Sequence, residues 1–123
     1  MIGNKILLDT NAVLYLLNGD ETLADFLMGQ ELCISIISEI ELLSYKKITE
    51  AERNGISQFI SLIEVLPLTD SVKVKAIEIR KDTSLKIPDS IIAGSAMAFR
   101  MPLLSSDKQL KTVKEIQLVL YEQ

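Results

Sequence analysis

Short apolar runs alternate along the chain with segments whose apolar residues recur every three or four positions. The first run, residues 5–8, predicts a buried strand, and the apolar residues 12–17 behind it predict a helix. The same alternation continues to the end of the chain. Further strands are predicted over 31–37, 64–68, 103–105 and 116–121, and further helices over about 22–28, 38–46, 49–63, 70–84, 88–99 and 108–111.

This succession of strands and helices predicts an α/β fold with a mainly parallel central sheet flanked by helices. No repeat, low-complexity segment or linker interrupts it, so we expect a single domain over residues 1–123. Two helix starts have the capping-box spacing, in which a hydroxyl residue is followed three positions later by Glu. They are Ser38 with Glu41 and Thr49 with Glu52.

The residue types that are scarce narrow the possible chemistry. The sequence has no histidine, which excludes histidine general bases, Ser-His-Asp triads and histidine-bound zinc. Its single cysteine, Cys33, cannot form an internal disulfide or a cysteine-rich zinc site and is expected to be a small core residue. Carboxylates without histidine or cysteine favour hard cations such as Mg²⁺ and Mn²⁺.

The composition, with 48% hydrophobic and 24% charged residues, is that of an ordinary globular domain. The apolar runs are too short and too often interrupted by charges to cross a bilayer. Residues 1–5 lead directly into the first strand without the layout of a signal peptide. We therefore expect a cytoplasmic protein with no membrane partner.

The net charge of −4 does not indicate nucleic-acid binding, but a metal site built from four carboxylates would account for it. Basic residues gather on and just after one predicted helix, where we favour a solvated face over contacts to nucleic-acid phosphates: Lys73, Lys75, Arg80, Lys81 and Lys86. No aromatic-rich stacking surface is evident. The aromatic residues are expected in the core or at an interface: Tyr15, Phe26, Tyr45, Phe59, Phe99 and Tyr121.

Three acidic residues stand out because they directly follow a predicted strand or open an apolar helix. Asp9 and Asp107 follow the strands at 5–8 and 103–105, where each could instead simply cap the next helix. Asp89 lies in the first turn of an almost wholly apolar helix, where the helix dipole alone favours an acid.

A fourth acid comes from the helix predicted over 38–46. Glu41 is fully explained by its capping box with Ser38, and Glu39 is a competing candidate. The two cannot share a helix face, and the spacing of their apolar neighbours does not decide between them.

Acids at the carboxyl ends of parallel strands meet at the edge of the sheet where α/β proteins bind ligands. Because such carboxylates repel one another, they are favourable together only with cations bound. Divalent ions held there can activate water and stabilise the charge of a transferring phosphoryl group. The acidic pattern therefore predicts metal-dependent phosphoryl chemistry.

Four segments resemble the motifs of PIN-domain nucleases, in the order of that family. Residues 7–11, Leu-Leu-Asp-Thr-Asn, resemble the first motif, and residues 38–42, Ser-Glu-Ile-Glu-Leu, resemble the second, which favours Glu41 over Glu39. Residues 87–93, Ile-Pro-Asp-Ser-Ile-Ile-Ala, resemble the third, and residues 103–107, Leu-Leu-Ser-Ser-Asp, the fourth. The resemblance covers nearly the whole chain, whose compact length is similar to that of VapC toxins of toxin–antitoxin pairs.

The resemblance implies a Mg²⁺- or Mn²⁺-dependent endoribonuclease that hydrolyses RNA phosphodiesters with metal-activated water. The implied catalytic and metal-binding residues are Asp9, Glu41, Asp89 and Asp107. The residues implied to orient these ligands or the substrate are Thr10, Asn11, Ser38 and Ser105. VapC-like proteins form homodimers and are inhibited by a cognate antitoxin whose C-terminal segment enters the active-site groove. The implied partners are thus RNA, an antitoxin and a second copy of the chain.

The chain departs from the family pattern at two places. Ser105 stands where Thr is frequent and keeps the hydroxyl group. Gln109 removes a further outer carboxylate, which bears on the number of bound metal ions more than on activity.

Two other functions are compatible with the sequence. One is a degenerate PIN fold that only binds a partner protein. The other is a different Mg²⁺-dependent phosphoryl-transfer enzyme, such as a receiver-like phosphoacceptor or a haloacid-dehalogenase-type phosphatase. Asn11 stands where such a phosphatase would carry a second Asp, which argues against that enzyme.

Overall fold

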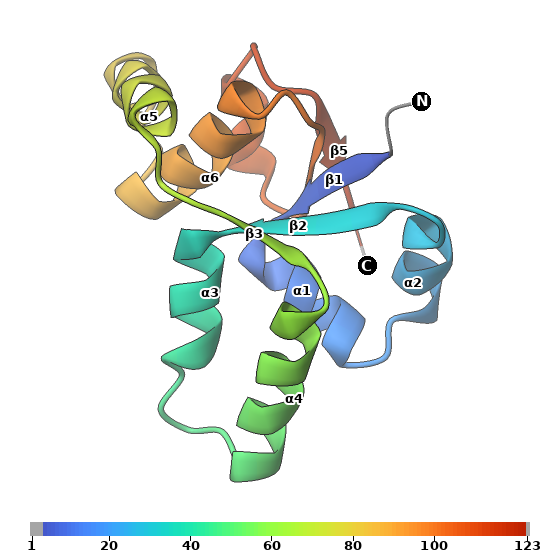
Figure 1. Ribbon diagram of the computed structural model, residues 1–123. Coiled ribbons are helices and arrows are strands. Elements are labelled where there is room, and N and C mark those ends of the chain that lie inside the picture. The colour runs from blue at the N-terminus through green and yellow to red at the C-terminus, as the bar shows by residue number, and fades with distance from the viewer. Residues whose placement is uncertain (1–3, 123) are drawn as a thin grey trace.

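A five-stranded parallel sheet, ordered β3-β2-β1-β4-β5, forms the centre of residues 4–122, which the computed structural model describes (Figure 1). The strands are β1 Lys5–Leu8, β2 Glu31–Ser35, β3 Glu64–Leu66, β4 Leu103–Ser105 and β5 Leu118–Leu120. The chain runs outward from β1 to β3 and then crosses to β4 and β5 on the other side of β1. This reversal of direction leaves a crevice beyond the carboxyl ends of β1 and β4. The predicted α/β fold with a parallel sheet is confirmed.

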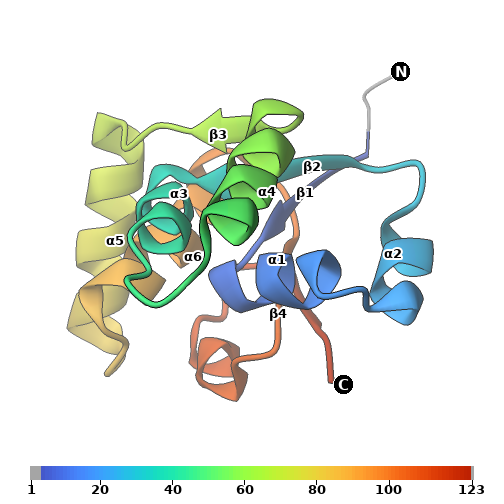
Figure 2. The ribbon, with the colours of Figure 1, turned by 90° about the horizontal axis from the view of Figure 1, so that it is seen from below.

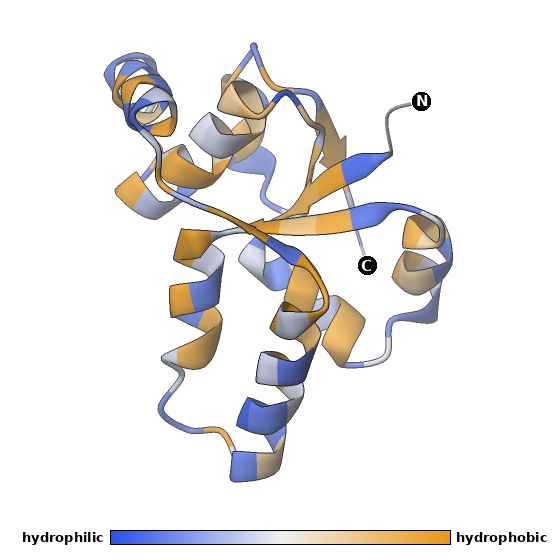
Figure 3. Cartoon of the chain, viewed as in Figure 1, coloured by the Kyte–Doolittle hydropathy of each residue, from blue (hydrophilic) through white to orange (hydrophobic). Residues whose placement is uncertain are grey.

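Helices cover both faces of the sheet (Figure 1, Figure 2). They are α1 Thr10–Leu17, α2 Glu21–Leu27, α3 Ile36–Leu43, α4 Glu50–Ser61, α5 Asp70–Asp82, α6 Ile87–Ala98 and the 3₁₀ helix η1 Lys108–Thr112. Neighbouring residues of β4 point to opposite faces. Leu103 joins a buried cluster with Ile92 of α6, and Leu104 joins a second cluster with Ile60 of α4. Figure 3 shows the strands as a largely hydrophobic band between these two helix layers.

The start of α3 differs from the prediction. Strand β2 ends at Ser35, whose side chain caps α3 by accepting a hydrogen bond from the Ile37 amide at 3.0 Å. The predicted capping box of Ser38 with Glu41 is therefore wrong, because both residues lie inside the helix. The β-branched pair Ile36 and Ile37 reads as strand by propensity, but the buried cap at Ser35 turns the chain before them. Helix α3 also ends at Leu43 rather than near residue 46.

Most other local predictions are confirmed. Thr49 and Glu52 form the expected capping box of α4, and Cys33 is fully buried in the core. The segment 108–111, expected as a short helix, is the 3₁₀ helix η1. Met1–Gly3, on which the expected absence of a signal peptide partly rests, lies outside the described residues. No helix within residues 4–122 is long and apolar enough to span a bilayer.

Candidate active site

A hollow of about 610 Å³ lies at the carboxyl ends of β1 and β4, and all four predicted acids line it. Asp9 follows β1, Asp107 follows β4, Asp89 comes from the first turn of α6, and Glu41 comes from α3. Glu39 does not line this hollow, which we call the carboxylate pocket. The fold thus brings together the four acids named from the sequence. Glu41, and not Glu39, is the acid of α3 that lines the pocket.

Asp9 is the most buried of the four acids, with 8% of its surface exposed. Its Oδ1 accepts a hydrogen bond from the Thr10 amide at 2.7 Å, and its Oδ2 accepts one from the Ser105 hydroxyl at 2.6 Å. Asp9 therefore does cap α1, as the simpler interpretation allowed. Since each carboxylate oxygen has a further lone pair, this capping leaves room for metal binding.

Three of the predicted orienting hydroxyl groups hold these acids in place. The Thr10 hydroxyl donates to Glu41 Oε1 at 2.7 Å, so the Ser38 hydroxyl, 2.8 Å away, must donate to Thr10 Oγ1. Ser105 donates to Asp9 and accepts from the Asp107 amide at 3.0 Å. One hydroxyl relay thus positions the carboxylate of α3, and one hydroxyl links the two acids at the ends of β1 and β4.

Asn11 and Asp107 occupy the wall of the pocket. Asn11 is exposed and lines the hollow on the first turn of α1. Asp107 caps η1 through a hydrogen bond of 2.9 Å from the Gln109 amide to its Oδ1. Asp107 therefore caps the helix that follows it, as the sequence suggested, and it also lines the pocket.

The acids of the pocket repel one another. Burial, followed by the nearby charges of Asp9, Asp107 and Glu41, raises the pKa of Asp89, while Lys86 lowers it. Burial also raises the pKa of Asp9, against the hydrogen bonds from Ser105 and Thr10. Within residues 4–122, none of the four acids forms a salt bridge to Lys or Arg. A bound cation would offset this repulsion.

The donors fit a divalent metal ion. The pocket offers carboxylate, hydroxyl and amide oxygens, which are the hard ligands that Mg²⁺ and Mn²⁺ prefer. Within residues 4–122, no group of three or more acids is arranged so that it could hold one ion by itself. One or two carboxylates with several waters would suit Mg²⁺, which usually keeps part of its hydration shell.

Tyr45, Ser44 and Ser106 also line the pocket and were not singled out from the sequence. Tyr45 was expected in the core or at an interface, and since 36% of its surface is exposed at the pocket, it is not a core residue. Burial and then the charge of Glu41 raise the pKa of its phenol. The sequence gives no periodic signal for this position, because Tyr45 lies just beyond the end of α3.

The C-terminal strand supports the loop after β4. The Tyr121 amide donates to the Ser105 carbonyl at 2.8 Å, and the Tyr121 hydroxyl donates to Asp20 Oδ2 at 2.6 Å. This hydrogen bond to Asp20 is the main cause that raises the pKa of Tyr121 to about 12. Tyr15, whose ring packs on that of Tyr121, has its hydroxyl 3.3 Å from that of Ser106. Helix α1, its following turn and β5 thus hold the segment that carries Asp107.

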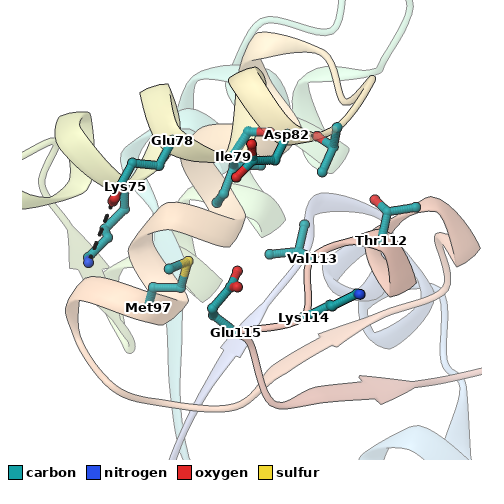
Figure 4. A pocket seen from close by; sticks show the side chains of 10 residues that line it. Lys75, Glu78, Ile79, Asp82, Met97, Thr112, Val113, Lys114 and Glu115 are labelled. Atoms are coloured by element: carbon teal, nitrogen blue, oxygen red, sulfur yellow. Dashed lines mark hydrogen bonds and ion pairs between the residues drawn. The ribbon is translucent and has the colours of Figure 1, made fainter.

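A second hollow, of about 450 Å³, lies between α5, the end of α6 and the segment after η1 (Figure 4). It contains none of the predicted site residues, and its charges are mixed, with Lys75 paired to Glu78 at 3.6 Å. Met97 lines it, eight residues beyond Asp89 on α6, which is about 12 Å along a helix axis. The acids therefore gather at the opposite end of α6 from this hollow.

Comparisons with known proteins agree with this geometry. The sequence model of the PIN domain family matches residues 6–116. No curated protein sequence matches the chain.

Three solved structures illustrate the similarity of fold. VapBC2 from Rickettsia felis, bound to a DNA fragment from its promoter, has a TM-score of 0.84 at 21% identity, covering 96% of this chain and 99% of that one. A toxin–antitoxin complex from Klebsiella pneumoniae has a TM-score of 0.81 at 23% identity, covering 95% and 98%. FitAcB from Neisseria gonorrhoeae has a TM-score of 0.77 at 19% identity, covering 92% and 95%.

Proposed function

The chain belongs to the PIN domain family, and we propose that it is a divalent-metal-dependent endoribonuclease, the VapC-type toxin of a toxin–antitoxin pair. The observation that carries the proposal is the convergence of Asp9, Glu41, Asp89 and Asp107 on one pocket that lacks a cationic side chain among the described residues. Such a cluster is suited to metal-assisted phosphoryl chemistry and needs no histidine.

In the proposed reaction, Asp9 and Asp89 are the principal metal ligands, and Glu41 and Asp107 complete the acidic wall. Mg²⁺ or Mn²⁺ would supply water activation and charge stabilisation at the phosphodiester. Thr10 fixes the Glu41 carboxylate, and Ser105 fixes that of Asp9 through the hydrogen bonds described above. These hydrogen bonds limit the motion of carboxylates that repel one another.

The proposed partners are RNA, a cognate antitoxin and a second copy of the chain. The similar structures include toxin–antitoxin complexes, which supports an antitoxin partner. We further propose that the protein acts in the cytoplasm, where a toxin of this type would meet its RNA.

Replacing single metal ligands tests the proposed nuclease. Asp9→Asn and Asp89→Asn are each expected to abolish RNA cleavage in Mg²⁺ or Mn²⁺ while the circular dichroism spectrum stays native. Asp25→Asn, on the exposed face of α2, is the matched control and should cleave like the wild type. Undiminished metal-dependent cleavage by both pocket variants would overturn the proposal.

A further inference from the structure

Tyr45 supplies the only aromatic ring that lines the carboxylate pocket within the described residues. The other lining groups are carboxylates, hydroxyl groups and the Asn11 amide. These polar groups suit a sugar–phosphate backbone and its metal ions, but they offer no flat apolar surface to a base. The 36% exposed surface of Tyr45 provides one beside them.

The segment that carries Tyr45 is held in place from α4. Tyr45 follows Ser44, the last capping residue of α3, and begins the connection to α4, which packs beside α3 (Figure 2). The Arg53 guanidinium donates to the Leu43 carbonyl at 2.7 Å and to the Tyr45 carbonyl at 3.0 Å. Arg53 thus binds carbonyl groups that the end of α3 leaves without helical partners. The backbone at Tyr45 is therefore anchored, which lowers the entropic cost of using its ring for binding.

The charges around the ring suit a chain of phosphates. Lys46 and Lys47 follow Tyr45 and are exposed, and Lys86 is close enough to Asp89 to lower the pKa of that acid. These cations lie outside the wall of the acidic pocket. A nucleic acid whose reacting phosphate lies at the carboxylates carries further phosphates outside the pocket, and cationic side chains attract those phosphates.

We propose that Tyr45 stacks on an unpaired base next to the phosphodiester held at the carboxylates. This inference rests on the proposed nuclease function and names a side chain that would bind its substrate. An aromatic ring can stack on any base, because every base has a π face. In a duplex both faces of each base are already covered, so paired RNA cannot use the ring.

Kinetic measurements distinguish a substrate-binding role of the Tyr45 ring from the catalytic role of the carboxylates. Tyr45→Ala is expected to raise KM for single-stranded RNA about tenfold, the effect typical of one stacked base, with kcat within about twofold of wild type. Tyr45→Phe keeps the ring and should retain most of the affinity. Phe26→Ala, which removes an exposed ring on α2 away from the pocket, is the matched control and should leave KM unchanged.

Fluorescence tests the stacking directly, because the chain has no tryptophan. Tyr45→Trp should be quenched by a short single-stranded RNA of mixed sequence, in Ca²⁺ to slow cleavage, and not by the same sequence as a duplex. Phe26→Trp should be quenched by neither. Quenching of both tryptophans, or equal quenching by duplex, would overturn the proposal.

Three further outcomes distinguish the failure of this inference from failure of the nuclease. If the wild type cleaves RNA and Tyr45→Ala has an unchanged KM, the stacking role is wrong and the nuclease stands. If that variant instead changes the oligomeric state measured by sedimentation, the ring belongs to a protein interface and the stacking role is also wrong. If the wild type cleaves no RNA in Mg²⁺ or Mn²⁺, the nuclease itself is wrong, and the stacking role of Tyr45 is wrong with it.

Discussion

At the scale of single residues, the hydroxyl groups of Thr10 and Ser105 decide where the acids of the pocket point. The sequence supplied both residues, because they stand beside strand-end acids in recognisable motifs. The sequence could not show which groups these hydroxyls bind, because Ser105 donates its hydrogen bond to a carboxylate 96 positions away. Glu41 needed the fold for a similar reason, because helical spacing alone did not separate it from Glu39. Tyr45 was missed because a single exposed aromatic after a helix carries no periodic signal.

Replacing Thr10 tests the hydroxyl relay. Thr10→Val keeps the side-chain volume but removes the donor to Glu41 and the acceptor for the fully buried Ser38. We expect RNA cleavage to fall about 10- to 100-fold, as for other groups that orient metal ligands. The unfolding free energy should fall by about 1–3 kcal/mol for the unpaired Ser38 hydroxyl.

Two control variants make the assay of this relay specific. Thr10→Ser should recover most of the cleavage, because it restores the hydroxyl group. Thr22→Val, on the exposed face of α2, should change neither cleavage nor unfolding. Full cleavage by Thr10→Val would show that Glu41 needs no positioning.

The raised pKa of Asp89 predicts a pH dependence of stability. Its unfolded value is near 3.8, and its folded value is raised by burial and by the other acids. Between these two values the native state binds more protons than the unfolded state, so the stability of the metal-free protein falls as pH rises. In the Asp89→Asn variant, the side chain at this position carries no charge at any pH. It should therefore melt at a higher temperature than the metal-free wild type at pH 7.

Thermal melting in a chelator over pH 4 to 7 checks this expectation. The advantage of Asp89→Asn should shrink as pH falls toward 4, where the wild-type acid takes up its proton. A constant difference between the two proteins at all these pH values would contradict the electrostatic explanation.

At the scale of elements, the position of Asp89 depends on how closely α6 packs against α5. Gly94 lies five residues beyond Asp89 on α6, and a Cβ built there would lie 3.1 Å from both the Ala76 amide nitrogen and the Val72 carbonyl oxygen. Both atoms belong to the backbone of α5, so that backbone, rather than a flexible side chain, must shift by a few tenths of an ångström to make room. The sequence predicted each helix from its own periodicity, but it could not show which glycine serves a helix contact.

A pair of glycine substitutions tests this contact. Gly94→Ala is expected to lower the unfolding free energy by about 1–3 kcal/mol, because overpacking outweighs the gain in helix propensity. Gly55→Ala, in α4, has no atom within 4 Å of the new Cβ and should stabilise the protein by up to about 1 kcal/mol. Urea denaturation of both variants gives the two values. Stabilisation by Gly94→Ala would show that α5 can shift without an energetic cost.

At the scale of the whole molecule, strand order creates the site. The sequence predicted the strands and their parallel direction, but it contains no local signal for β1 lying between β2 and β4. That order brings Asp9 and Asp107 to adjacent strand ends from opposite parts of the chain. It also gathers four acidic side chains in one pocket of a chain whose net charge is −4, and each bound divalent ion would offset two of those charges.

Metal binding should therefore stabilise the folded protein and allow it to bind an anionic substrate. Mn²⁺ or Mg²⁺ at about 100 times its dissociation constant should add about 2.7 kcal/mol to the unfolding free energy, which thermal melting detects as a higher Tm. Asp9→Asn should lose most of this shift, and Asp25→Asn should keep it. NaCl at matched ionic strength controls for general screening of the acids.

RNA binding should disappear in a chelator, because the metal-free carboxylates of the pocket repel phosphate. No stabilisation at millimolar metal, together with metal-independent partner binding, would instead favour a PIN fold that only binds a protein.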